Sequence, residues 1–313
     1  MKTPIAIIFS VVLVGLLIGS SGCIGGETKE TISTAIDISF QSNMPPSEIQ
    51  ERTPFQIGIK LENKGGFDVN ESRAKVVLSG ISSVGFDITY NGTQTIETTN
   101  SVKLTKVQQI GEDQIEGGQE LIVFEANTTP NYPGDQIQTI SAKVCYPYGT
   151  TAQATACMGQ SVIGQTTGTK ICEVQGELEG LQNTGAPVRV TKIVQFPRGG
   201  AKVTGLTFMI DIENKGSGTP YIYTGGSYYD CSHLNYNHIN RVNIKDVYLL
   251  SNPDNVATCS QTNSIPIGEK GITVSCVLDN IPEGEYEDTI IAELQYGYTE
   301  DESTSVTIRN IPE

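Results

Sequence analysis

The side chains of this 313-residue chain best suited to covalent or metal chemistry are its seven cysteines and two histidines. No two cysteines are spaced as Cys-x-x-Cys, and the histidines, His233 and His238, have only Cys231 near them. Structural zinc sites draw on closely spaced Cys and His ligands. We therefore predict that the cysteines form disulfide bonds and that the chain has no metal site.

The segment Ser217–Asn240 has the composition of a recognition loop. Tyrosine supplies contact area at low entropic cost, and Asn, Ser and Gly supply adaptable hydrogen bonds. The candidate ligand-binding residues are Tyr221, Tyr223, Tyr228, Tyr229 and Tyr236. The alternative interpretation is an ordinary surface loop held by Cys231. Asp230 and the two histidines lack a recognised chelate spacing, so they predict no metal site here.

Other chemistry has little support in the sequence. The acidic clusters Glu283–Asp288 and Glu300–Glu302 lack the ligand order of an EF-hand, so we expect solvated turns there. There is no Gly-x-Ser-x-Gly elbow, no phosphate-binding loop, and no histidine beside a nucleophile and an acid. A net charge of −15 disfavours nucleic-acid binding. We predict no catalytic residues, no cofactor and no enzymatic activity.

The N-terminus predicts export. Lys2 is followed by an apolar run from Ile5 to Ile18, then by small residues and Cys23. A basic start, a short apolar core and a small-residue exit are typical of a signal peptide, here residues 1–22. The alternative is a tilted, uncleaved anchor, although the run is shorter than the roughly 20 residues of a bilayer span. Both interpretations place the rest of the chain at the cell surface.

The residues Ser21-Gly22-Cys23-Ile24-Gly25-Gly26 resemble an archaeal lipoprotein cleavage site. The resemblance implies that Cys23 becomes the first residue of the mature protein and carries a lipid. Residues 23–31, which are mostly small or polar, would then be a flexible tether.

An internal repeat organises the exported part. Phe55–Leu61 is apolar at every second position and ends in Glu-Asn-Lys-Gly; the same design returns 151 residues later at Leu206–Ile212. Gly118 and Gly268 each begin a further strand-like run, and Ala142–Tyr148 matches Ala292–Tyr298 at an offset of 150. Period-two alternation predicts strands, and the repeated landmarks predict a tandem duplication.

We predict an all-β protein of two tandem antiparallel β-sandwiches, residues 32–163 and 171–313, joined by a linker at 164–170. Each unit has some seven short strands between turn residues. The alternating strand into Asn-Lys-Gly and the glycine-led strands after it resemble the CARDB type of immunoglobulin-like domain. That resemblance implies adhesion or presentation outside the cell, without catalytic residues and without a particular ligand.

Strand parity suggests how the cysteines pair. Cys145 and Cys157 share the polar faces of Ala142–Tyr148 and Ala152–Met158, so a hairpin centred near Thr151 would place them opposite each other on an outer face. The other four cysteines allow three connectivities. We favour Cys259–Cys276, across a short Gly/Pro-containing connection, which leaves Cys172–Cys231.

Three glycosylation sequons, at Asn70, Asn91 and Asn127, lie in the first unit. Together these features predict a membrane-anchored extracellular binding, adhesion or envelope scaffold protein. Its partners would be the membrane, through the lipid or anchor, and an envelope protein or glycan. The alternatives are an accessory subunit of a surface secretion or transport complex, and an enzyme.

Overall fold

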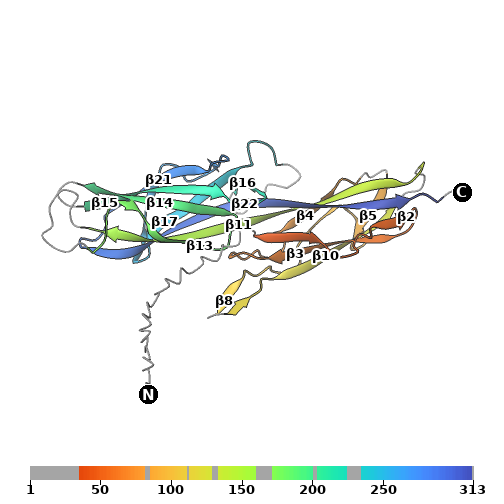
Figure 1. Ribbon diagram of the computed structural model, residues 1–313, viewed down its shortest axis with the longest axis horizontal. Coiled ribbons are helices and arrows are strands. Elements are labelled where there is room, and N and C mark those ends of the chain that lie inside the picture. Colours follow the sequence, from red (N-terminus) through yellow and green to blue (C-terminus); the bar gives the residue numbers. More distant parts are fainter. Residues whose placement is uncertain are drawn as a thin grey trace, which may run out of the picture. The chain divides into compact units, whose positions relative to one another are not determined.

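The computed structural model describes residues 35–81, 85–110, 113–128, 133–159, 171–199, 203–223 and 234–311. Throughout these residues the secondary structure consists of β-strands, nearly all paired antiparallel, as predicted (Figure 1). The described part contains no helix that is long and apolar enough to cross a membrane. The predicted signal segment, Cys23 and the tether lie outside the described residues.

Two five-stranded sheets follow the alternating patterns of the sequence. The first has the order β1 (Ile36–Phe40), β3 (Phe55–Asn63), β10 (Gln119–Thr128), β5 (Phe86–Tyr90) and β6 (Thr93–Gln94). The second has the order β12 (Gly176–Glu177), β14 (Val188–Gly199), β15 (Val203–Asn214), β21 (Ile272–Asp279) and β19 (Thr258–Cys259). Alternate residues of β3 and β15 are buried, as expected for strands with one face on a core.

A ten-stranded sheet draws on both predicted units. Its main path is β18 (Asn252–Val256), β17 (Arg241–Leu249), β22 (Tyr286–Arg309), β11 (Gln136–Met158), β4 (Lys75–Ser79) and β7 (Glu97–Thr99). Also paired to it are β13 (Glu179–Asn183), β16 (Thr219–Tyr221), β20 (Ile265–Pro266) and β2 (Glu48–Gln50), which runs parallel to β22. A separate hairpin joins β8 (Gln108–Ile110) and β9 (Asp113–Ile115).

The centre of this sheet is one long antiparallel ladder. β11 pairs with β22 along its whole length, from Gln136 opposite Ile308 to Met158 opposite Tyr286 (Figure 1). The predicted hairpin near Thr151 is therefore wrong, because Thr151 continues the strand and pairs with Glu293. Thr150 and Thr151 are β-branched and favour extended backbone, and the partner strand satisfies their backbone groups.

Each repeated sequence motif lies in an inner strand of a five-stranded sheet, β3 in the first sheet and β15 in the second. Ile59 lies opposite Ile122 in the first half, and Ile210 lies opposite Val274 in the second. At the far ends of β3 and β15, Asn63 and Asn214 begin the turns of the Asn-Lys-Gly motif. The Asn63 amide accepts a hydrogen bond from Gly65 N at 3.0 Å, and the Asn214 amide accepts one from Gly216 N at 3.2 Å. The asparagines thus act through their side chains and have no positive φ.

Four buried tyrosines fill the middle of the shared ladder. Tyr146 lies opposite Tyr298 and Tyr148 opposite Tyr296, with ring centroids 6.2 and 6.3 Å apart. Each hydroxyl has a hydrogen-bonding partner: Tyr146 accepts from Ile36 N, Tyr148 accepts from Phe67 N, and Tyr298 donates to Asn214. Tyr296 bonds Thr150 at 2.9 Å. The cluster therefore joins β1, β15 and the loop after β3 to the two long strands.

Candidate functional site

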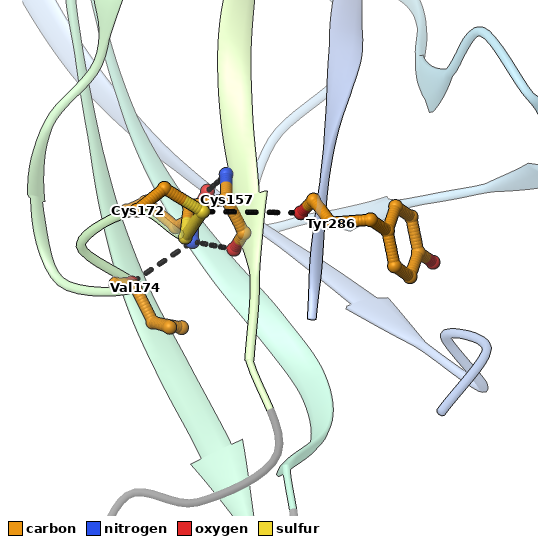
Figure 2. Close-up of a disulfide and its surroundings, with 5 residues drawn as sticks. Cys157, Cys172, Val174 and Tyr286 are labelled. Carbon is orange, nitrogen blue, oxygen red and sulfur yellow. Dashed lines mark hydrogen bonds between the residues drawn. A yellow bond between two sulfur atoms is a disulfide. The ribbon is translucent and has the colours of Figure 1, made fainter. Parts of the chain in front are cut away.

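The cysteine pairing differs in part from the prediction. Cys157, at the end of β11, is bonded to Cys172, with the Cα atoms 5.8 Å apart (Figure 2). This excludes both Cys145–Cys157 and Cys172–Cys231. The reason is the continuous β11, which separates Cys145 and Cys157 along one strand. The prediction of Cys259–Cys276 is confirmed, and these residues face each other in the β19–β21 ladder.

A buried glutamine frames the first of these disulfides. Gln195 on β14 accepts a hydrogen bond from Cys157 N at 3.2 Å and donates to Cys157 O at 2.6 Å. It also donates to Val174 O at 2.9 Å, so it holds the chain on both sides of the bridge. The Cys172 sulfur lies 3.9 Å from Tyr286 O. This end of β11 is thereby fixed to β14 and to the segment that follows Cys172.

Cys145 is also disulfide-bonded, to a cysteine outside the described residues. It is only 2% exposed, although parity predicted an outer face. The reason is β16, which adds to β22 and places Tyr221 against Cys145. Cys231 and Cys23 are the two remaining candidates for its partner, because the other described cysteines are already paired.

Non-reducing peptide mapping tests this connectivity. We expect linked peptides for Cys157–Cys172 and Cys259–Cys276, and a third containing Cys145. If Cys23 carries a lipid, Cys145 should be linked to Cys231. Alkylation before digestion prevents exchange and serves as the control. A linked Cys145–Cys157 peptide in the native protein would contradict the connectivity.

A groove of about 470 Å³ lies on the described part of the chain, and residues from both halves line it. The loop between β3 and β4 contributes Gly66, Phe67, Asp68, Asn70 and Arg73, and the segment after β7 contributes Lys103 and Lys106. Pro147 and Tyr148 come from β11, Gln295 comes from β22, and Tyr223 follows β16. We call this cavity the junction groove.

Asn100 holds the two loops of the junction groove together. Its side chain is fully buried and accepts hydrogen bonds from Arg73 N and Ala74 N, both at 2.8 Å. It donates to Asn70 O at 2.9 Å and to Val102 O at 2.8 Å. One amide thus uses both its donor and its acceptor capacity to fix the loops that carry the basic side chains.

The charges in the junction groove are arranged around Asp68. Its carboxylate accepts from Lys106 N at 2.8 Å and pairs with Lys103 Nζ at 2.6 Å. Burial raises the pKa of Asp68, but the hydrogen bonds from Lys103 and from the Lys106 backbone outweigh it, and the net pKa lies below the usual range. Asp68 is therefore ionised at neutral pH. The Lys106 ammonium is exposed and has no ion pair among the described residues.

Aromatic rings form another part of the lining. Phe67 is 39% exposed, and its ring packs on that of Tyr148 with the centroids 5.4 Å apart. Gly149 allows this approach, since a Cβ there would lie 2.9 Å from the Phe67 ring. Burial raises the pKa of Tyr148, so its hydroxyl stays protonated and donates to Gly185 O. The groove offers one exposed ring beside its cationic groups.

The predicted tyrosine cluster is divided by the structure. Tyr221 is 2% exposed and packs against Cys145, which makes it a structural residue. Tyr223 lines the junction groove, whereas Tyr236 is 85% exposed and does not line it. Tyr228, Tyr229, Asp230 and His233 lie outside the described residues. Within the described part, no group of three or more His, Cys, Asp or Glu could hold a metal ion.

The sequence predicts a solvated turn at residues 300–302, and this prediction is wrong. These residues lie within β22, where Glu300 is opposite Val144 and is 5% exposed. Its Oε1 atom has no hydrogen-bonding partner among the described residues. Burial, followed by the negative charges of Asp37 and Asp301, raises the pKa of Glu300 to about 7.

The three sequon asparagines Asn70, Asn91 and Asn127 are all exposed. Asn91 and Gly92 form the two-residue turn between β5 and β6, with φ of 48° and 76°. Such a turn favours Asn-Gly. Asn70 lies in the lining of the junction groove, so a glycan there would stand at its mouth. Modification of these sites stays a prediction.

No protein family model matches this chain, and no curated protein matches it. Among solved structures it is similar to the secreted serine protease VesC from Vibrio cholerae, at 10% identity and a TM-score of 0.20, over 83% of this chain and 50% of that one. It is also similar to the collagen adhesin CNA from S. aureus, at 11% identity and a TM-score of 0.11, over 89% and 93% of the two chains. The chain thus spans half the length of the protease structure. Likenesses at this level support no assignment of activity.

Sequence reasoning missed the junction groove. Its basic residues lie in two loops about thirty residues apart, and the amide that joins these loops is an unremarkable Asn in the sequence. Basic and acidic residues are equally frequent between residues 68 and 106, so the sequence holds no clear signal of a basic groove.

Proposed function

We propose that this chain is a non-catalytic binding protein of the cell surface, anchored to the membrane through its N-terminal segment. It would consist of two immunoglobulin-like β-sandwich units and act in adhesion or as an envelope scaffold. The observation that carries the proposal is the junction groove, whose lining comes from both halves of the chain. A cavity with a few converging polar groups and an aromatic wall has the composition of a ligand site.

The rigidity of the frame supports this role. The groove rests on β11 and β22, which are paired along the whole of β11 and packed through the tyrosine cluster. Disulfides fix the chain near one end of β11 and in the second five-stranded sheet. Disulfides persist in oxidising compartments, in keeping with the predicted export. A preorganised site loses little entropy when it binds.

Binding to the envelope tests the proposal. The full chain, purified from its own membranes, should be retained by polysaccharide or protein fractions of the same envelope. Lys106→Glu should lower retention about tenfold or more, because it reverses an exposed charge in the groove. Lys270→Glu is the matched control, since Lys270 is exposed in a turn and does not line the groove. Wild-type protein that no fraction retains would contradict the proposal.

A further inference from the structure

We propose that β22 binds an extended, basic segment of another protein by strand addition along its edge between Glu300 and Val306. We call this stretch the open edge. Among the described residues it is paired on one side only, with β11. On the other side β16 ends opposite Thr299, and β2 begins opposite Thr307. The open edge shares no residue with the lining of the junction groove, so it is a second binding surface.

Alternate residues of the open edge direct their backbone groups away from β11. The Thr307 N–H donates to Ser47 O at 2.8 Å on the side away from β11, so the odd-numbered residues of β22 face outward here. Asp301, Ser303 and Ser305 are exposed and have no backbone hydrogen bond on that side among the described residues. Their N–H and C=O groups form a row that an added strand can pair with.

The shape of the open edge favours a free segment over a second copy. The strands at its two ends, β16 and β2, already take the places beside Thr299 and Thr307. A second copy brings the same flanking strands, which would collide before the two β22 edges came within the roughly 4.8 Å of neighbouring strands. A free segment of about five residues, at roughly 3.3 Å per residue, fits between the flanking strands.

The charges at the open edge favour a basic segment. Asp301 and Glu302 are exposed, and the neighbouring Glu300 is buried. Lys143 lies opposite Asp301 on β11 and offsets its charge, whereas Glu302 has no ion pair among the described residues. Glu302 shares its face of the strand with the half-buried Thr304. A segment with Lys or Arg beside Glu302 and a β-branched residue beside Thr304 would gain two favourable cross-strand pairs.

Selection of random heptapeptides, displayed on phage, against the full chain tests this. We expect binders that combine Lys or Arg with β-branched residues, and Ser303→Pro should weaken their binding about tenfold or more. Proline removes the outward N–H of residue 303 and leaves the ladder to β11 intact. Ser303→Ala is the matched control, because it also loses the hydroxyl contact with Ser141 but keeps the N–H. Thermal unfolding verifies that both variants fold.

A second measurement leaves the protein unchanged and modifies the best peptide. Methylation of a peptide nitrogen whose N–H faces β22 should weaken binding about tenfold or more. Methylation of the next nitrogen along should not, because the N–H groups of a strand alternate in direction. In the protein, Glu302→Lys should weaken binding about threefold or more. Glu269→Lys, in an exposed turn, should leave binding unchanged.

Four results overturn strand addition of a basic segment. The first three are a selection without binders, binders that Ser303→Pro leaves unchanged, and binders that are all neutral or acidic. The fourth is a dimer in sedimentation that Ser303→Pro abolishes, because the occupant is then a second copy. None of these results concerns the junction groove. The proposed function fails separately, if the envelope fractions do not retain the wild type.

Discussion

Glu300→Gln is expected to make the protein more stable than the wild type at pH 8 and to leave the two equal near pH 4. Glu300 is 5% exposed, and its pKa is raised from 4.5 to about 7, first by burial and then by the charges of Asp37 and Asp301. The folded state therefore binds a proton that the unfolded state has released. Stability that is fully present below pH 4.5 is lost as the pH rises through 7. The loss is at most about 3 kcal/mol.

Urea unfolding between pH 4 and pH 8 measures this effect as a difference between the two proteins. Glutamine has no proton to release and stays neutral, so the stability advantage of the variant over the wild type should grow from pH 4 to pH 8. Glu302→Gln is the matched control, because Glu302 is on the same strand but exposed. If Glu300→Gln and the wild type show parallel pH profiles, folding does not raise the pKa of Glu300, and the prediction is wrong.

Asn100→Ala should lower the free energy of unfolding by at least about 2 kcal/mol, because buried groups left without a partner each cost about 1–3 kcal/mol. The substitution leaves a cavity in place of the buried amide and removes the side-chain partner of Ala74 N and Val102 O, whereas Arg73 N and Asn70 O keep their hydrogen bond to each other at 3.2 Å. It should also loosen the two loops of the junction groove, so retention by envelope fractions, which the proposed function predicts, should weaken together with stability.

The control for Asn100→Ala is Asn263→Ala. Asn263 is exposed, and among the described residues its side chain bonds only the neighbouring Thr262 hydroxyl, so its loss should change stability by less than about 0.5 kcal/mol. Chemical unfolding of both variants at one pH gives the comparison. If Asn100→Ala is as stable as Asn263→Ala, the loops are held by other contacts, and the role given to Asn100 is refuted.

The parts of the fold that the sequence predicted are those set by local alternation. Phe55–Leu61 and Leu206–Ile212 became β3 and β15, each with alternate buried residues, because the period of two places every second side chain on one face. Ile59 and Ile210 are both buried, as their places in the alternation predict. The pairing of Cys259 with Cys276 could be predicted from the sequence because few residues separate them.

The failures all involve partners far away in the sequence. Parity placed Cys145 on an outer face, but β16 from the second half covers that face with Tyr221. Glu300 belongs to an acidic run that is typical of an exposed segment, yet it lies in β22 and is buried. The junction groove depends on Asn100, and nothing in a run of polar residues indicates which amide will be buried. These features depend on tertiary contacts that short-range patterns do not encode.

The long β11–β22 ladder also limits how this molecule can evolve. Domains that only touch can be exchanged between proteins by recombination in the linker between them. Here a break within 164–170 would separate β11 from β22, its partner along every residue from Gln136 to Met158. Each fragment would then carry an unpaired strand edge, which favours aggregation. The loops of the two halves can therefore vary independently, whereas the two long strands have to stay in one chain.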